Sequence, residues 1–284
     1  MSNLLELKHV TKDYGSFKLE DVSFTLPGGT ILGLIGENGA GKSTTIKCIL
    51  NLVHQDSGSI RIFGQDNSGS NWREDIGLVL DESTFHDLLR GEDVGKILSK
   101  SYKHWDADLF ARYLKQFDLP GGKEIKTYSK GMKTKLSIAA ALSHHPRLLL
   151  LDEATSGLDP VVRDEILDEF LTFIQDEDHA ILISSHITSD LEKAADYITY
   201  LHRGRVALQG GKDELLESYG RLVCTKAQLD GVDRGFVVGT RSSQFQCEAL
   251  IQKRCDFQRI YPGLTVDPVT LEEIMVFTVR GDAK

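Results

Sequence analysis

Residues 30–44 read TILGLIGENGAGKST, and this segment determines which fold the rest of the chain must accommodate. Its first part is apolar and β-prone, so we expect a buried strand there. Residues Gly36–Thr44 fit the phosphate-binding pattern G-x-x-x-x-G-K-[ST]. The residues that follow are apolar at positions 46, 49, 50 and 53, which is helical spacing. A strand, a glycine-rich loop and a helix in this order are the context that the motif requires.

The residue types of this loop suit the binding of a nucleotide and Mg²⁺. Glycines let backbone N–H groups turn toward phosphate oxygens, and the start of the next helix adds partial positive charge. Lys42 is predicted to reach the β- and γ-phosphates, and the Ser43 hydroxyl to bind Mg²⁺. A glycine-rich turn without a ligand is the alternative. The predicted ATP-binding residues of the loop are Gly36, Glu37, Asn38, Gly39, Ala40, Gly41, Lys42, Ser43 and Thr44.

Polar side chains follow two further predicted strands. Arg147–Leu151 is a buried-strand pattern that ends in Asp152 and Glu153. Because ligands of α/β sheets gather at the carboxyl ends of strands, Asp152 is predicted to organise Mg²⁺ and Glu153 to act as the general base. His186 comes just after the strand-like run Ala180–Ser184, and we predict a sensor of the γ-phosphate. The alternatives are a helix-capping acidic pair and a structural histidine.

The rest of the pattern predicts an α/β protein. Short β-type runs separated by turn residues open the chain and predict an antiparallel part. About residues 84–145 are mainly helical in pattern, with candidates near 87–102, 106–118 and 130–144, and predict a helical subdomain. Strand-like runs then alternate with helical stretches, as in a sheet with a parallel core, and they lie at Arg147–Leu151, Ala180–Ser184 and Tyr197–Leu201.

The pattern changes at about residue 219. We therefore predict a large domain over residues 1–218 and a small C-terminal α+β accessory domain over residues 219–284. Three short β-prone runs occur there, at Arg221–Cys224, Gly235–Thr240 and Gln258–Tyr261. A final helix is expected to open at Asp267-Pro268 and to run through Leu271, Ile274 and Met275.

Composition excludes several classes of protein. The chain has 284 residues and a net charge of −9, which argues against a general nucleic-acid binder because phosphate backbones are held by Lys and Arg. No apolar run approaches the about 20 residues of a membrane span, and no secretory signal is readable, so we expect a cytoplasmic protein. The four cysteines have no C-x-x-C pair and are expected to be free thiols, mostly in the core, with no transition metal.

Six motifs in one order resemble those of the ATP-binding cassette (ABC) ATPases, which are P-loop NTPases, over about residues 4–218. They correspond to the aromatic loop, Walker A, signature, Walker B, D-loop and switch histidine of that family. In this sequence they lie at Tyr14, Gly36–Thr44, Tyr128–Met132, Leu148–Glu153, Ser156–Asp159 and His186. The resemblance implies an ATPase that uses ATP and Mg²⁺.

The resemblance also implies a pair of cassettes that face head to tail, with ATP between the Walker A loop of one and the signature of the other. The implied signature residues are Ser129, Lys130, Gly131 and Met132, with the Ser129 hydroxyl and the Gly131 N–H on the partner's γ-phosphate. The implied D-loop residues are Ser156, Gly157, Leu158 and Asp159. Tyr14 would stack on adenine. Because one cassette is encoded, a second copy or a homologous cassette is an expected partner.

Two positions depart from the family pattern. The signature is usually Leu-Ser-Gly-Gly-Gln, whereas this chain has Tyr-Ser-Lys-Gly-Met, so Lys130 adds a cation. Lys130 either attracts the γ-phosphate or is simply solvated. In the loop after the predicted strand Ile76–Leu80, Asp81 stands where the family has a glutamine that touches the metal and couples to the membrane partner. A carboxylate can reach Mg²⁺ directly or through water, but it lacks the donor of the amide.

The resemblance implies the ATP-hydrolysing subunit of an ABC transporter, held at the cytoplasmic face of the membrane by a separate integral-membrane permease. A single cassette with a short tail resembles the bacterial exporters that pair with six-span subunits, so a peptide, toxin or drug-like cargo is expected. The alternative is a soluble ABC ATPase that acts on a nucleic-acid or ribosomal partner. The sequence offers little for it, since a second phosphate loop and sustained heptads are both missing.

Overall fold

The computed structural model describes residues 2–81, 84–242 and 246–280, and its centre is a sheet of six strands. The strand order is β10-β9-β3-β8-β7-β6, in which only the edge strand β10 is antiparallel to its neighbour. The strands are β3 (Thr30–Ile35), β6 (Ile76–Val79), β7 (Leu148–Asp152), β8 (Ala180–Ser185), β9 (Tyr197–His202) and β10 (Arg205–Gly211). The predicted α/β fold with a mixed sheet is confirmed.

The parallel strands form because their side chains are apolar on both faces. All six residues of β8 are buried, as are the four leucines of β7, and near-continuous apolar runs are typical of strands covered on both sides. Since β3, β7 and β8 run in parallel, their carboxyl ends meet at one edge of the sheet. This edge receives the loops that follow the three strands.

A second sheet is antiparallel, as the opening residues predict. Its order is β2-β1-β4-β5, and the strands are β1 (Asn3–Asp13), β2 (Lys18–Pro27), β4 (Ser57–Ile62) and β5 (Gln65–Asp66). One hydrophobic cluster joins this sheet to helix α1 (Lys42–Ile49) and to one face of the central sheet, and it includes Val22, Leu34 and Ile46. The phosphate loop therefore lies between two sheets that pack on a common core.

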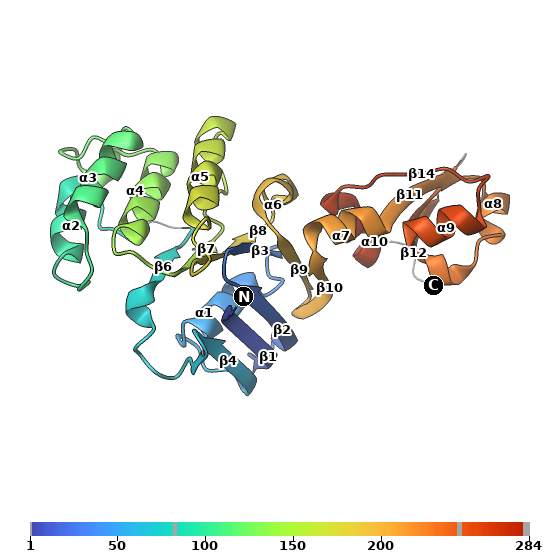
Figure 1. Cartoon of the computed structure of the whole chain (residues 1–284), viewed down its shortest axis with the longest axis horizontal. Coiled ribbons are helices and arrows are strands. Elements are labelled where there is room, and N and C mark those ends of the chain that lie inside the picture. Colours follow the sequence, from blue (N-terminus) through green and yellow to red (C-terminus); the bar gives the residue numbers. More distant parts are fainter. Residues whose placement is uncertain (1, 82–83, 243–245, 281–284) are drawn as a thin grey trace.

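Helices cover the part of the chain that was expected to be helical, at one end of the molecule in Figure 1. They are α2 (Gly91–Leu98), α3 (Ala107–Gln116) and α4 (Lys130–Leu142), with a short 3-10 turn, Ile125–Thr127, between α3 and α4. Local capping starts two of them: the Asp106 carboxylate accepts from Leu109 N–H (2.7 Å), and the Ser129 hydroxyl accepts from Met132 N–H (3.2 Å). Two further helices, α5 (Pro160–Phe173) and α6 (Thr188–Ala194), connect the strands of the central sheet.

The C-terminal residues form a third sheet at the opposite end of the molecule (Figure 1). The antiparallel strands β11 (Tyr219–Cys224), β12 (Val237–Ser242), β13 (Cys247–Gln252) and β14 (Val266–Asp267) are ordered β12-β13-β11-β14. The helices are α7 (Lys212–Ser218), α8 (Lys226–Asp230), α9 (Arg254–Ile260) and α10 (Leu271–Arg280). The expected final helix is confirmed, whereas strand β13 was not predicted.

The predicted strand at Gln258–Tyr261 is wrong, because most of these residues belong to helix α9. Phe257 is fully buried, and its ring centroid lies 4.8 Å from that of Tyr261, four residues on. Side chains at this spacing share one face of a helix, so burial of Phe257 and its contact with the half-buried Tyr261 favour the helix over the local β preference.

The cysteines agree with the prediction of free thiols. Cys48, Cys224 and Cys247 are buried, and Cys255 is exposed. Among the residues that the structure describes, no helix is both long and apolar enough to cross a membrane.

Helix α10 packs back onto the central domain. Leu271, Ile274 and Phe277 belong to the same hydrophobic cluster as Leu191 of α6. The backbone N–H of Leu271 also donates to the Glu192 carboxylate (2.7 Å). Helix α10 is thus part of the core that supports β8, the strand that His186 follows. The sheet β11–β14 has a separate hydrophobic cluster.

Truncation of this helix at its core should be costly. We expect Ile274→Ala to lower the free energy of unfolding by about 3 kcal/mol, because the side chain is fully buried and the change leaves a cavity. Urea denaturation measures the effect. Ile260→Ala is the matched control, since Ile260 is 58% exposed and its loss should be within about 0.5 kcal/mol. Equal losses in the two variants would contradict the packing described for α10.

Candidate functional site

The phosphate loop connects β3 to α1 at the carboxyl edge of the central sheet. Gly41 precedes α1 with φ of 115°, a conformation that side chains other than glycine rarely adopt. A Cβ on Gly36 would lie 2.6 Å from the Leu201 carbonyl oxygen, so this position also requires glycine. The pattern of glycines therefore follows from backbone geometry, and it directs the loop around the start of α1.

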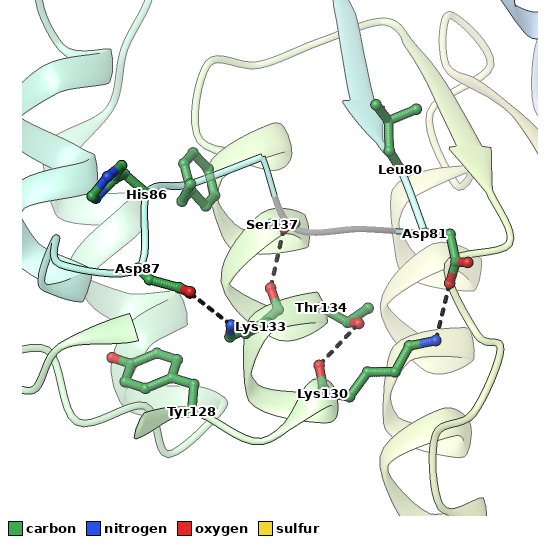
Figure 2. Close-up of a pocket in the computed structure, with 10 residues that line it drawn as sticks. Leu80, Asp81, His86, Asp87, Tyr128, Lys130, Lys133, Thr134 and Ser137 are labelled. Atoms are coloured by element: carbon green, nitrogen blue, oxygen red, sulfur yellow. Dashed lines mark hydrogen bonds and ion pairs between the residues drawn. The ribbon is translucent and has the colours of Figure 1, made fainter. Parts of the chain in front are cut away.

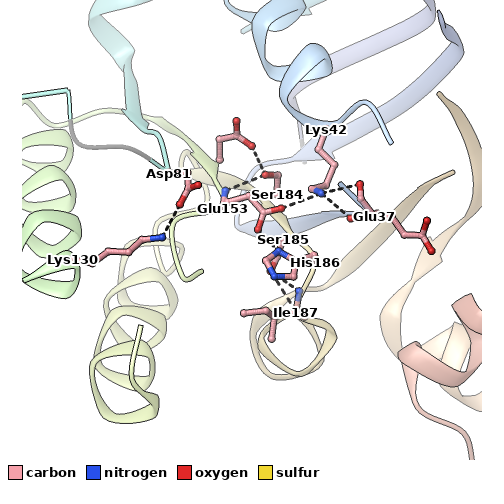
Figure 3. A network of polar contacts seen from close by, with 11 residues as sticks. Glu37, Lys42, Asp81, Lys130, Glu153, Ser184, Ser185, His186 and Ile187 are labelled. Atoms are coloured by element: carbon pink, nitrogen blue, oxygen red, sulfur yellow. Dashed lines mark hydrogen bonds and ion pairs between the residues drawn. The ribbon is translucent and has the colours of Figure 1, made fainter. Parts of the chain in front are cut away.

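Lys42 is the first residue of α1 and is only 5% exposed. Its Nζ donates to the Gly36 carbonyl (2.7 Å) and the Glu37 carbonyl (3.3 Å) and lies 3.0 Å from Glu153 Oε1 (Figure 3). A buried ammonium is stable only when it is paired and hydrogen-bonded. The loop and Glu153 together satisfy this condition.

Glu153 connects Lys42 to His186. The second carboxylate oxygen, Oε2, lies 2.6 Å from His186 Nδ1, so the carboxylate has a partner on each side (Figure 3). Glu153 also adopts a left-handed backbone conformation with φ of 53°. Backbone strain of this kind is found at functional sites, where surrounding contacts hold it in place. The three residues predicted for phosphate binding, base catalysis and sensing are therefore in one network.

Ser184 is a site residue that the sequence did not suggest. It is buried in β8, its hydroxyl donates to Asp152 Oδ1 (2.6 Å), and the same oxygen accepts from Glu153 N–H (3.1 Å). The parallel register of β7 and β8 pairs Asp152 with Ser184, so the contact depends on which strands are neighbours. Ser184 therefore orients the Asp152 carboxylate and holds the backbone at Glu153.

A hollow of about 340 Å³ opens beside the loop. It is lined by Phe17, Asn38, Gly39, Gly41, Lys42, Ser43, Thr44, Asp81, Asp152 and Glu153. Backbone amides and an ammonium suit phosphate oxygens, while a hydroxyl and carboxylates are oxygen ligands of the kind that Mg²⁺ prefers. Within the described residues no group of three or more His, Cys, Asp or Glu side chains could hold a metal by itself. Mg²⁺ is usually bound by one or two carboxylates together with substrate phosphates, and Asp152 and the Ser43 hydroxyl in this lining are donors of that kind.

The aromatic side chain that lines this hollow is Phe17 and not the predicted Tyr14. Tyr14 lies at the turn between β1 and β2, is 49% exposed, and has the Lys12 ammonium 5.7 Å from its ring centroid. Phe17 is half-buried at the same turn, and a Cβ on Gly41 would lie 3.2 Å from its ring. Both rings belong to the same turn, but only Phe17 is among the residues that line the hollow.

We expect Phe17→Ala to weaken ATP binding about tenfold, because stacking of a base on an aromatic ring contributes about 1–3 kcal/mol. Calorimetric titration of each variant with ATP measures the change. Tyr14→Ala is the matched comparison and is expected to have the smaller effect. A larger loss of affinity in Tyr14→Ala would contradict the role of Phe17 and support the prediction from the sequence that Tyr14 stacks on adenine.

The signature residues begin helix α4. Ser129 is its N-cap, Lys130 its first residue, and the Tyr128 hydroxyl donates to the Pro120 carbonyl (3.0 Å). Burial raises the pKa of Tyr128, which keeps this hydroxyl neutral. Ser129 is exposed at the start of the helix, whereas Gly131 and Met132 are half-buried. Ser129, Lys130, Gly131 and Met132 are not among the residues that line the hollow of the phosphate loop. This is expected if they face the ATP of another cassette.

The two unusual residues of the sequence form a contact. Lys130 Nζ lies 3.0 Å from Asp81 Oδ1, and each side chain is 50% exposed (Figure 3). Lys130 therefore forms an ion pair with Asp81 and is not simply solvated. Asp81 also lines the hollow of the phosphate loop, from where its carboxylate could reach Mg²⁺ directly or through water.

The D-loop residues connect Glu153 to helix α5. Ser156 N–H donates to the Glu153 carbonyl (3.0 Å), and Gly157 has φ of 70°. Leu158 is buried, and Asp159 caps α5 by accepting from the N–H groups of Val161 (3.2 Å) and Val162 (3.1 Å). The carboxylate of Asp159 is thus used to start a helix.

Comparison with known proteins agrees with this site. The ABC transporter family model matches residues 19–156. The lantibiotic transport ATP-binding protein SrtF of Streptococcus pyogenes is 34% identical over 226 residues, which cover 78% of this chain and 97% of that protein. The bacitracin transport ATP-binding protein BcrA of Enterococcus faecalis is 33% identical over 225 residues, which cover 76% of this chain and 71% of that protein.

A solved structure supports the same relationship. The ATP-binding subunit of an ABC transporter is 30% identical, has a TM-score of 0.68, and matches 75% of this chain and 92% of its own. The fold and the phosphate loop define a P-loop ATPase of the cassette type. This chain belongs to the family of ABC transporter ATP-binding proteins, and its activity is ATP hydrolysis.

Proposed function

We propose that this chain is the subunit that binds MgATP, dimerises and hydrolyses ATP to drive a separate membrane permease. The observation that carries the proposal is the network in which Glu153 lies between Lys42 and His186 beside the phosphate hollow. A carboxylate held between two partners next to a phosphate site is suited to position and activate water.

In the proposed reaction, Lys42 leaves the Gly36 carbonyl to bind the β- and γ-phosphates. Glu153 accepts a proton from water, whose oxygen attacks the γ-phosphorus as the bond to the ADP oxygen breaks. His186 orients Glu153 and contacts the γ-phosphate. Ser43 and Asp152 would hold Mg²⁺, with Ser184 directing Asp152. When bound, Mg²⁺ supplies positive charge that offsets the charge of the phosphates.

A second cassette completes the proposed site. Either another copy of this chain or a homologous cassette would place its Ser129 hydroxyl and Gly131 N–H on the γ-phosphate. This is supported by the exposure of Ser129 at the start of α4 and by the lining of the phosphate hollow, to which α4 contributes no residue. The D-loop, Ser156–Asp159, would lie at the same interface.

The proposed cargo is a peptide, toxin or drug-like molecule that is exported. The support is the relatives, whose names refer to lantibiotic and bacitracin transport. The cassette would then lie at the cytoplasmic face of the membrane and bind the permease there. The alternative of a soluble ABC ATPase that acts on ribosomes or nucleic acid is not favoured, because the relatives are named for transport and the net charge is −9.

Isolation from the native membrane tests this proposal. We expect an integral-membrane protein to accompany the chain and to change the rate of MgATP hydrolysis when it is added back to the purified cassette. Phosphate release with and without that protein measures the change. A rate that responds to ribosomes or DNA and to no membrane protein would overturn the transporter assignment and support the soluble alternative.

A further inference from the structure

The two positions at which this sequence departs from the family pattern are in contact with one another. Asp81 follows β6, and Lys130 is the first residue of the signature helix α4, 49 residues later. Figure 2 shows the carboxylate and the ammonium facing each other, with 3.0 Å between Oδ1 and Nζ. The glutamine and glycine of the usual pattern could not form this ion pair, so the two departures belong together.

Asp81 stands between two parts of the molecule. It lines the hollow of the phosphate loop and also a larger hollow, of about 740 Å³, that Lys130 and Lys133 border (Figure 2). Lys130 is held from another side by the D-loop, since a Cβ on Gly157 would lie 3.4 Å from its Nζ. The side chain of Lys130 is therefore directed by contacts with two motifs, although half of it remains exposed.

We propose that Lys130 binds the γ-phosphate of the nucleotide on the second cassette, and that Asp81 is the residue that positions it. The inference rests on the proposed dimer. Lys130 directly follows Ser129, and its ammonium adds a full charge to the partial charge at the start of α4. An ion pair as exposed as this one is weak, so the ammonium can exchange Asp81 for a phosphate of higher charge.

The chain contains a matched pair for comparison. Asp87 Oδ1 lies 2.8 Å from Lys133 Nζ, which joins the same loop region to the same helix one turn further on. Lys133 is set back from the helix start, where Ser129 and Lys130 lie. Loss of the Asp87–Lys133 ion pair should therefore disturb the loop as much as loss of the Asp81–Lys130 pair. It should not weaken binding of the γ-phosphate.

The experiment measures ATP-induced dimerisation by sedimentation, with Glu153→Gln in every variant so that ATP is retained. We expect Lys130→Met to raise the dimer dissociation constant about tenfold and Lys130→Arg to restore most of the affinity, because a hydrogen bond to a charged group is lost and then replaced. Asp81→Asn should raise the constant about threefold and add nothing to Lys130→Met, since Asp81 acts through Lys130. Asp87→Asn and Lys133→Met should each stay within about twofold.

Exchange of the two charges separates phosphate binding from a purely structural role. In Asp81→Lys with Lys130→Asp the ion pair can form again, but a carboxylate now faces the γ-phosphate, so dimerisation should remain weak. Recovery of dimerisation in this variant, or no effect of Lys130→Met, would overturn the proposal. Additive effects of Asp81→Asn and Lys130→Met would overturn the positioning role of Asp81. If Glu153→Gln alone fails to dimerise with ATP, the proposed dimer itself is wrong, which is a separate result.

Discussion

Replacement of Glu153 by glutamine is expected to reduce kcat for ATP hydrolysis by about a thousandfold, because general-base catalysis contributes about 10²–10⁴ to a rate. Glutamine has nearly the same shape as glutamate, so the contacts that hold position 153 near Lys42 and His186 are largely kept. An amide cannot accept the proton of the attacking water. Phosphate release at saturating MgATP measures the loss, and ATP should remain bound in a stable dimer.

The control for this prediction is Glu217→Gln. Glu217 is an exposed residue of α7, and the same chemical change there should leave kcat within about twofold. A Glu153→Gln variant that keeps more than about a tenth of the normal turnover would show that another group accepts the proton. His186 would then be the first candidate, since it lies 2.6 Å from Glu153 in the same network.

Lys42→Met is expected to weaken ATP binding by about a hundredfold, because it removes a buried ammonium that is directed at the phosphates. The side chain is 5% exposed, and methionine fills similar space without a charge or a donor. Removal of the cation also leaves the Glu153 carboxylate paired with His186 and puts more negative charge in front of the nucleotide. Titration calorimetry with ATP measures the affinity.

Lys47→Met is the matched control for the loss of Lys42. Lys47 lies on the same helix, but its side chain is exposed and does not line the phosphate hollow. We expect the affinity of the Lys47→Met variant for ATP to stay within about twofold of that of the unmodified protein. If Lys42→Met bound ATP as tightly as Lys47→Met, the hollow beside the loop would not be the phosphate site.

Features that depend on neighbouring residues could be predicted from the sequence. The phosphate loop is one example, because the φ of 115° at Gly41 is a backbone requirement within the loop itself. The start of α4 is another, since Ser129 caps it through a hydrogen bond three residues away. The buried strand β7 followed from an unbroken run of leucines. These predictions needed only local hydrogen bonds and the period of apolar residues.

Features that depend on distant parts of the chain could not be predicted in the same way. The β-prone residues from Gln258 became mostly helical because Phe257 of α9 is buried against residues of the third sheet, among them Leu222 and Ile251. Helix α10 was expected, but its packing on α6 was not. In each case the energy of burial depends on a surface that is assembled elsewhere in the chain.

The sequence by itself therefore determined the class of this protein and the chemical groups of its site: a phosphate loop, two carboxylates and a histidine. Only the tertiary structure decided that Ser184 directs Asp152, that Phe17 rather than Tyr14 lines the hollow, and that Asp81 pairs with Lys130. The physical reason is that a motif is held by bonds within a few residues. A contact between motifs depends on strand order, register and helix packing, which the whole chain must form together.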